Sequence, residues 1–264
     1  MGASAREWER FGREDAYFAV VSQEQYHREN LDDAARERFF ESGRAHADWI
    51  LGRIRGRVRD GYSPRSVLDY GCGVGRVLLP LAKDADRALG VDVSPSMLAE
   101  ARRNAEQQGL ANLELAEPPA LASHAAKYEL VHCGLVLQHI PNRDGWGVLD
   151  QLLGLVAPGG VAVIQVPFRV SHWTATAFSK AMRIPFAHNL VNLVGRRPWD
   201  YPYMEMNLYS ADRLLSAVLD QDMRVLDLWL ERGGDPRWRY DSCWLFARRP
   251  AEGEPPEPGP MAAR

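Results

Sequence analysis

A short apolar segment runs into alternating glycines at Val67-Leu68-Asp69-Tyr70-Gly71-Cys72-Gly73-Val74-Gly75-Arg76. An apolar run followed by a glycine turn is typical of a strand that passes through a tight loop into a helix. At such a junction, backbone N–H groups and the positive end of the helix dipole can meet a ligand, and glycine lets the ligand approach the backbone. The segment therefore predicts a ligand-binding strand–loop–helix unit.

From residue 66 onward, short apolar runs alternate with segments of helical periodicity, which predicts an α/β fold with a parallel, Rossmann-like sheet. Strands are expected at Ser66–Tyr70, Ala88–Asp92, Leu113–Ala116, Glu129–Cys133, Val161–Val166, Arg224–Leu230 and Ser242–Ala247. Helices are expected at Arg76–Lys83, Ser96–Gln108, Trp146–Leu155 and Ser210–Leu219. Pro158-Gly159-Gly160 is expected to be a turn between a helix and the next strand.

The segments on either side of this alternation have a different character. Residues 1–60 predict an N-terminal helical cap, with helical spacing at Leu31–Phe40 and Ala45–Val58. The ligand-binding domain is expected over residues 61–249, with residues 168–207, rich in aromatics and interrupted by prolines, as a lid inserted after the fifth strand. Residues 250–264 predict a disordered tail.

Composition narrows the possible partners. The 264 residues carry a net charge of −3, which offers no basic footprint for a nucleic acid or an anionic membrane. Three cysteines far apart in the chain favour neither a disulfide framework nor a zinc site. With no signal-peptide pattern and no apolar run long enough for a membrane span, we expect a cytoplasmic protein without a bound metal.

The loop favours a cationic nucleoside over a dinucleotide. In a dinucleotide loop, the third glycine would stand where Arg76 is. Asp69 would repel a pyrophosphate but suits the ammonium and sulfonium groups of S-adenosylmethionine. Asp92, at the end of the second predicted strand, can accept hydrogen bonds from both ribose hydroxyls. The adenine is expected to meet Glu117 through its amino group and the apolar side chains of Val93, Met97 and Leu135.

These residues together resemble the class I S-adenosylmethionine-dependent methyltransferases, especially the bacterial small-molecule group. The resemblance covers residues 66–167 and includes the DxGxGxG loop, Gly90-Val91-Asp92-Val93-Ser94, Leu137-Gln138-His139-Ile140-Pro141 and Ala157-Pro158-Gly159-Gly160. It implies a seven-stranded sheet with a final antiparallel hairpin and an active site above the carboxyl ends of the strands. It also implies that Gly71, Gly73 and Gly75 line the amino-acid part of the cofactor. Glu117 departs from the family, which usually has Asp there.

The predicted reaction transfers the methyl group of S-adenosylmethionine to an O, N or C nucleophile of a small molecule, mainly by aligning the reactants and excluding water. His139 is the candidate base, although it can equally brace the turn before Pro141. The size of the lid favours a natural product or a sugar as substrate. Candidate substrate contacts are Tyr26, His172, Trp173, Tyr201 and Asn207.

Several alternatives stay open on the sequence alone. The same fold can hold S-adenosylmethionine for a cyclisation or isomerisation, and a nonenzymatic ligand-binding protein would carry the same loop. A dehydrogenase is disfavoured by Arg76. Arg44 and His46, on the helix before the first strand, could approach the cofactor carboxylate or the pocket. A solvated helix face is the alternative for both of them.

Overall fold

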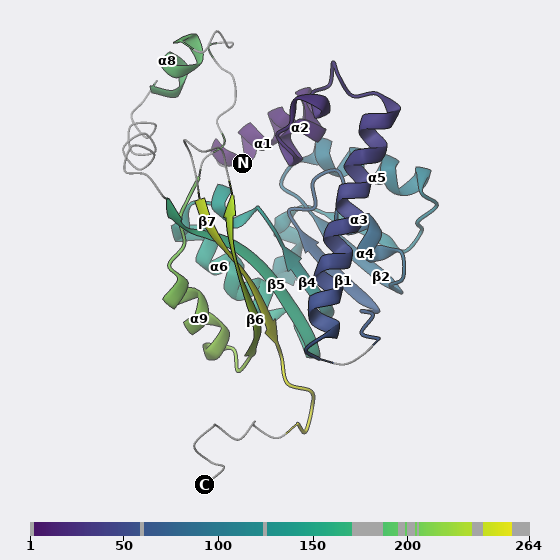
Figure 1. Cartoon of the computed structure of the whole chain (residues 1–264), viewed down its shortest axis with the longest axis vertical. Coiled ribbons are helices and arrows are strands. Elements are labelled where there is room, and N and C mark those ends of the chain that lie inside the picture. Colours follow the sequence, from purple (N-terminus) through teal and green to yellow (C-terminus); the bar gives the residue numbers. More distant parts are fainter. Residues whose placement is uncertain are drawn as a thin grey trace.

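Within the described part of the chain, seven strands form one sheet in the order β3-β2-β1-β4-β5-β7-β6 (Figure 1). The computed structural model describes residues 3–58, 61–123, 126–170, 187–194, 199, 204, 206–233 and 240–254. The strands are β1 Ser66–Tyr70, β2 Arg87–Val91, β3 Leu113–Ala116, β4 Tyr128–Cys133, β5 Val156–Val170, β6 Arg224–Gly233 and β7 Tyr240–Arg248. Strands β1 to β5 pair in parallel, and β7 runs antiparallel to both β5 and β6. The predicted sheet is confirmed.

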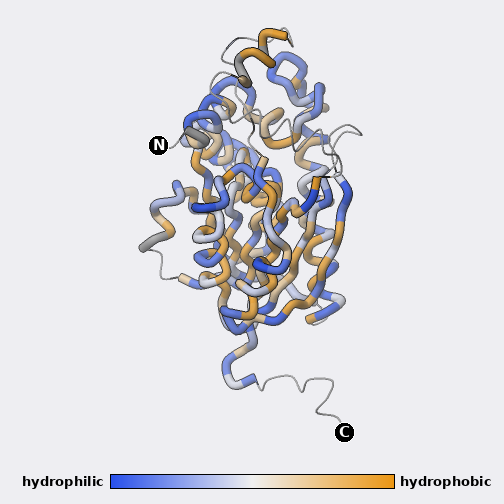
Figure 2. Tube along the Cα trace, turned by 90° about the vertical axis from the view of Figure 1, so that its left-hand side faces the viewer, coloured by the Kyte–Doolittle hydropathy of each residue, from blue (hydrophilic) through white to orange (hydrophobic). Residues whose placement is uncertain are grey.

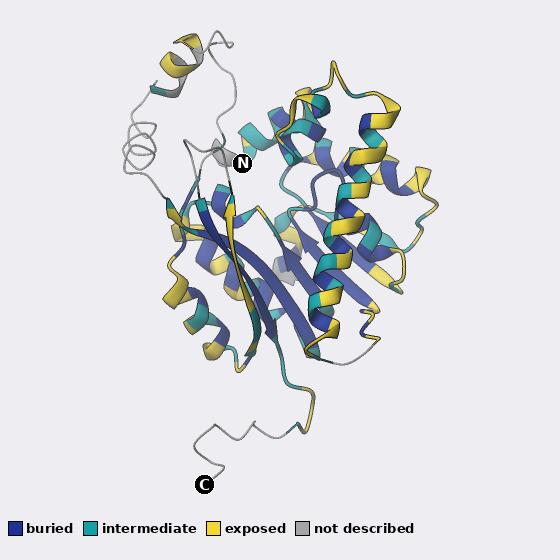
Figure 3. Cartoon of the chain, viewed as in Figure 1, coloured by how far each residue is buried: buried dark blue, intermediate teal, exposed yellow. Residues whose placement is uncertain are grey.

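Helices cover both faces of the sheet. The described helices, of which α8 stands apart from the sheet (Figure 1), are α1 Ala3–Glu14, α2 Ala16–Val20, α3 Asp33–Arg55, α4 Leu78–Ala82, α5 Pro95–Gln107, α6 Asn142–Gly154, α8 Ala187–Val194 and α9 Ala211–Asp220. Short 3-10 turns, η1 Glu24–Tyr26, η2 Pro118–Ser123 and η3 Leu137–His139, lie between them. The inner strands β1, β4 and β7 and most of β5 are buried, whereas the edge strand β6 and the outer helix surfaces are largely exposed (Figures 2 and 3). This burial on both faces explains why the inner strands read as continuous apolar runs.

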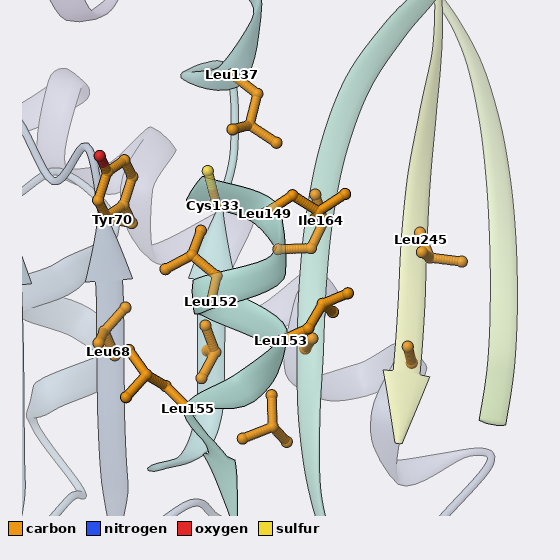
Figure 4. Packing of buried hydrophobic residues seen from close by; sticks show 14 of the residues in the cluster. Leu68, Tyr70, Cys133, Leu137, Leu149, Leu152, Leu153, Leu155, Ile164 and Leu245 are labelled. Atoms are coloured by element: carbon orange, nitrogen blue, oxygen red, sulfur yellow. The ribbon is translucent and has the colours of Figure 1, made fainter. Parts of the chain in front are cut away.

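Two cores lie on opposite faces of the sheet. One core packs α6 and α9 against β1, β4 and β5, with side chains such as Leu68, Leu149 and Ile164 (Figure 4). The other packs α3, α4 and α5 against the opposite face and contains Ile50 and Trp244. Because the two cores fix the sheet from both sides, the carboxyl ends of β1, β2 and β4 are held at one edge.

A third, smaller core joins α1, α2 and η1 to the edge of the sheet where the parallel strands end. It contains Phe11, Tyr17, Phe39, Val74 and Met97. The N-terminal helices predicted from the sequence are therefore present, and they lie over the carboxyl ends of the strands (Figure 1). No described helix is both long enough and apolar enough to cross a membrane.

Several predicted boundaries were wrong for identifiable reasons. The two segments expected around Leu31–Phe40 and Ala45–Val58 form one helix, α3, because Gly43 lies against the backbone oxygen of Arg76. A Cβ at Gly43 would lie 1.9 Å from that oxygen, so the glycine marks a close contact rather than a break. Helix α4 begins at Leu78, later than the predicted start at Arg76, because Arg76 still belongs to the loop.

Strand β5 is longer than the predicted Val161–Val166. The expected turn at Pro158-Gly159-Gly160 is an irregular start of this strand, in which Gly159 N donates to Arg249 O at 3.0 Å. At the other end, Arg169 and Val170 pair with β7, so the first residues of the predicted lid belong to the sheet. Most of the predicted lid lies outside the described residues. The domain boundaries near residues 60 and 250 stay predictions.

Candidate functional site

The glycine loop after β1 has the backbone conformation that glycine favours. Gly71, Gly73 and Gly75 have φ angles of +76°, +54° and +91°, in the left-handed region. A Cβ at Gly71 would lie 2.1 Å from a methyl carbon of Val136, and one at Gly73 would lie 2.7 Å from a methyl carbon of Val20. We call this loop the glycine cradle. Gly71 and Gly73 cannot be replaced by a residue with a Cβ without a clash with Val136 or Val20.

Asp92 lies one residue beyond β2 and ties this loop to the start of α5. Its Oδ2 accepts a hydrogen bond from Gly73 N at 2.9 Å, and its Oδ1 accepts one from Ser94 N at 2.9 Å. Burial, together with the negative charge of Asp69, raises the pKa of Asp92 to about 6, although hydrogen bonds from backbone amides act to lower it. The carboxylate thus stands beside the glycine cradle, as expected for neighbouring parallel strands that end at one edge.

Asp69, in β1, faces His132, its register partner in β4. Each residue is 3% exposed, and Nδ1 of His132 lies 2.7 Å from Oδ1 of Asp69. Arg76 lies close enough to interact with Asp69 through its charge, and its Nη1 donates a long bond of 3.4 Å to Ser42 Oγ. Sequence reasoning selected Asp69 but missed His132, because only the strand register brings the two residues together.

His132 belongs to a buried group of polar and aromatic side chains. Its ring lies parallel to Trp244, with ring centroids 6.2 Å apart, and meets the edge of His46 at 5.7 Å. Burial, His132 and Arg76 together lower the pKa of His46 to about 3. The buried Nε2 atoms of both histidines and Nε of Arg76 have no hydrogen-bond partner. His46 is thus not on a solvated helix face.

His139 lies in η3, directly beyond β4, and is half-buried. Its ring contacts Trp8 of α1, with centroids 4.8 Å apart. Asn207 is buried beside the same turn, and both its backbone N and its Nδ2 donate to Gln138 O, at 2.7 and 3.1 Å. The predicted substrate residue Asn207 therefore braces the turn that carries His139.

The other predicted site residues differ in how far they are buried and in how near they lie to the glycine loop. Val93 is half-buried next to Asp92, whereas Glu117 is exposed after β3. Leu135 is 46% exposed with a φ of +63°, and its N donates to Gln165 Oε1 at 3.0 Å. Met97 and Tyr26 are buried in the core formed with α1 and α2, away from the surface. His172, Trp173 and Tyr201 lie outside the described residues.

The N-terminal helices supply residues that sequence reasoning missed. Glu9 of α1 accepts hydrogen bonds from Ser94 Oγ at 2.8 Å, Ser96 N at 3.1 Å and Ser96 Oγ at 2.7 Å, all at the start of α5. Trp8 contacts His139 and Val20 lies against Gly73. No sequence motif contains these residues, so only their contacts in the folded structure identify them.

The described residues hold no cluster of three or more His, Cys, Asp or Glu side chains that could bind a metal. Cys72, Cys133 and Cys243 are buried free thiols, and burial raises the pKa of each. The chemistry of this edge therefore rests on Asp69, Asp92, the glycine cradle and the histidines near β4.

Comparison with known proteins agrees with this geometry. Residues 67–160 match the family model described as a methyltransferase domain, and they include the cradle, Asp92, His132 and His139. Over these residues, the chain is similar to this family. Among its relatives is the ubiquinone biosynthesis O-methyltransferase of Methylocella silvestris, 36% identical over 115 residues, which are 41% of this chain and 44% of that protein. The corresponding protein of Acinetobacter baylyi is 33% identical over 103 residues, which are 38% of this chain and 42% of that protein.

The match thus spans less than half the length of these curated relatives and centres on the methyltransferase domain. Solved structures resemble more of the chain, at lower identity. The magnesium protoporphyrin IX methyltransferase of Synechocystis, crystallised with S-adenosylhomocysteine, has a TM-score of 0.61 and 19% identity, and the match covers 93% of this chain and 97% of that one. The N-methyltransferase NodS of Bradyrhizobium japonicum, also with S-adenosylhomocysteine, has a TM-score of 0.59 and 15% identity, covering 94% of this chain and 100% of that one. These likenesses confirm the methyltransferase fold.

Proposed function

We propose that this chain binds S-adenosylmethionine at the carboxyl ends of β1 and β2 and transfers its methyl group to a hydroxyl oxygen of a small molecule. The observation that carries the proposal is the Asp92 carboxylate, which lies beside a glycine cradle and is hydrogen-bonded to Gly73 N at 2.9 Å. A nucleoside whose ribose hydroxyls reach Asp92 would place its amino-acid part along Gly71 and Gly73, next to Asp69.

The residues present fit this cofactor. Gly71, Gly73 and Gly75 all have left-handed φ angles, which shape the turn between β1 and the following helix beside Asp92. Asp69 and Asp92 are carboxylates beside the cradle, which suits a ligand carrying ammonium and sulfonium charges. Glu117 and Val93 stay the proposed adenine neighbours. When bound, the cofactor supplies an already activated methyl group.

The protein's own contribution is alignment and exclusion of water. Trp8 and Val20 of the N-terminal helices contact His139 and Gly73, so these helices would cover the reacting groups. A hydroxyl nucleophile must lose its proton, and His139, half-buried beyond β4, is the proposed acceptor. The substrate hydroxyl would approach between His139 and the cradle.

The choice of oxygen follows from the relatives. Those named above are O-methyltransferases of ubiquinone biosynthesis, with 36% and 33% identity over the matched stretch. We propose a natural product or a sugar as the substrate class, on the size and aromatic content of residues 168–207. We further propose that the protein acts on neither nucleic acids nor membranes, since its net charge is −3. Its place of action is proposed to be the cytoplasm.

The binding step is tested by isothermal titration calorimetry with S-adenosylhomocysteine. Asp92→Asn should weaken binding at least tenfold, because hydrogen bonds to a charged group contribute about 1.5–3 kcal/mol. Asp86→Asn is the matched control: Asp86 precedes β2 at the opposite edge, is exposed and pairs with Arg65 at 2.6 Å. It should bind as the wild type does. Folded wild-type protein that binds neither S-adenosylmethionine nor its demethylated product would overturn the proposal.

The reaction itself is tested by the products. Methyl transfer converts S-adenosylmethionine into S-adenosylhomocysteine in step with a methylated acceptor, whereas a cyclase or isomerase on this fold leaves the cofactor intact. Incubation with methyl-labelled S-adenosylmethionine and a panel of phenols, glycosides and sugars should give labelled product. Turnover of an acceptor without loss of the label from the cofactor would favour the alternative reaction.

A further inference from the structure

The proposed site contains a buried pair that the proposed reaction does not use directly. Asp69 and His132 face each other across neighbouring strands, each 3% exposed, with Nδ1 and Oδ1 2.7 Å apart. We propose that His132 is a positioning residue, which holds Asp69 as an oriented carboxylate for the ammonium group of the cofactor's amino-acid part. This inference rests on the proposed function and adds a residue to that site.

A buried carboxylate requires a close donor. Transfer of an ionised carboxylate out of water is costly unless it is paired and hydrogen-bonded. The other positive group near Asp69 is Arg76, whose Nη1 bonds to Ser42 Oγ and whose buried Nε has no partner. Asp92 adds negative charge on the opposite side. The 2.7 Å contact to His132 is therefore the main fixed support of Asp69.

The surroundings of His132 hold its ring in one orientation. Trp244 lies parallel to the ring at an interplanar angle of 14°, and His46 meets it edge-on. On the side of Nε2, a Cβ added to Gly134 would lie 2.9 Å away, so Nε2 faces the backbone just beyond β4. Nδ1 is thus turned to the carboxylate, where an Nδ1–H can donate to it.

Several titratable groups surround the pair of Asp69 and His132. The groups that face the pair are His46 from α3, Arg76 from the loop after β1, Asp92 from the end of β2, and the thiols of Cys72 and Cys133. His46 is neutral, since burial lowers its pKa to about 3. Both thiols are neutral because burial raises their pKa. Arg76 is the positive group among them, and the imidazole orients Asp69 through the 2.7 Å contact.

The test compares two amides at position 132. His132→Asn places a side-chain N–H near the position of Nδ1 and can still donate to Asp69, whereas His132→Gln carries its amide near the position of Nε2 and cannot. The affinity for S-adenosylhomocysteine is measured by calorimetry between pH 5.5 and 8.5. The Asn variant should stay within about threefold of the wild type, and the Gln variant should lose at least tenfold at neutral pH.

Rescue by the Asn variant separates positioning from a structural effect. Both variants lose the imidazole ring, but only the Asn variant keeps a donor to Asp69, so only the Gln variant should lose affinity. Val131→Ala, next in β4 but facing the opposite core, is the control: it should lower the melting temperature and leave the affinity profile unchanged. A Gln variant with wild-type affinity and profile, or an Asn variant as weak as the Gln variant, overturns the inference. If the wild type binds no S-adenosylhomocysteine, the proposed function fails first.

Discussion

At the scale of single residues, Asp92 is the group whose charge responds most directly to pH in the accessible range. Its pKa is raised to about 6, mainly by burial. The ionised carboxylate of Asp92 is the form that can accept hydrogen bonds from the ribose hydroxyls of the cofactor. Protonation would therefore remove the acceptor while leaving the surrounding backbone in place.

We expect the affinity for S-adenosylhomocysteine to fall as the pH drops through about 6, approaching a tenfold loss per pH unit below it. Because the pKa is raised in the folded protein, Asp92 by itself stabilises the fold as the pH falls from 6 towards its ordinary value, so Asp92 does not cause unfolding in this window. Calorimetry from pH 5 to 8, with circular dichroism at each pH, measures both effects. Affinity that stays flat down to pH 5 would contradict this role of Asp92.

Residues within one motif were predictable, and residues paired across strands were not. Asp69, Gly71, Gly73 and Gly75 follow one another in the chain, and Asp92 ends the next strand, so local rules identified them. The pairing of Asp69 with His132 depends on the register of β1 and β4, which are 63 residues apart in sequence. Trp8 and Glu9 were missed for the same reason, since a helix far away in sequence meets the site only after folding.

At the scale of elements, the docking of α1 depends on one carboxylate. Glu9 receives three hydrogen bonds from Ser94 and Ser96 at the N-terminus of α5, where the helix dipole also favours a negative charge. Phe11 adds apolar contact in the core shared with Met97. Helix α1 is thus held to α5 by a small set of contacts that one substitution can weaken.

We expect Glu9→Ala to speed backbone hydrogen exchange in α1 by about tenfold, because each lost bond contributes about 0.5–1.5 kcal/mol net. Glu14→Ala on the same helix is the control. Glu14 pairs with Arg10 at 2.8 Å on the exposed face, and such pairs contribute only about 0.2–0.5 kcal/mol. Equal exchange rates in the two variants, measured by mass spectrometry, would show that Glu9 does not hold the helix.

Among the elements, both ends of strand β1 were predicted correctly, because the strand is buried on both faces and bounded by turn residues. Strand β5 was not, because it extends at both ends of the predicted Val161–Val166. At its start, Val156 pairs with Tyr128 of β4 ahead of Pro158-Gly159-Gly160, and at its end Arg169 and Val170 pair with β7. The two stretches of helical spacing, Leu31–Phe40 and Ala45–Val58, belong to one helix, α3, which runs through Gly43 where the chain lies close to Arg76.

At the scale of the whole molecule, we expect the bound cofactor to contact several segments that come from different parts of the chain. The glycine loop, the start of α5 and the N-terminal helices all border the proposed site. A ligand that binds only the folded state stabilises the whole chain by mass action.

Saturation with S-adenosylhomocysteine at about 100 times its dissociation constant should add about 2.7 kcal/mol to the free energy of unfolding. For a chain of this size, this corresponds to a rise in melting temperature of roughly 5–10 °C. Scanning calorimetry with the Asp92→Asn variant as control measures the effect. A melting temperature that is unchanged at saturation would contradict the predicted coupling.

The contacts between α1 and α5 also have a consequence for biosynthesis. Glu9 and Ser94 are separated by 85 residues, so the ribosome makes the first helix well before its partner exists. At about 5–20 residues per second, Phe11 waits on the order of ten seconds for its partner Met97 in α5. The first helix therefore docks only after α5 has been made, and nascent chains arrested before residue 94 should be good clients for chaperones.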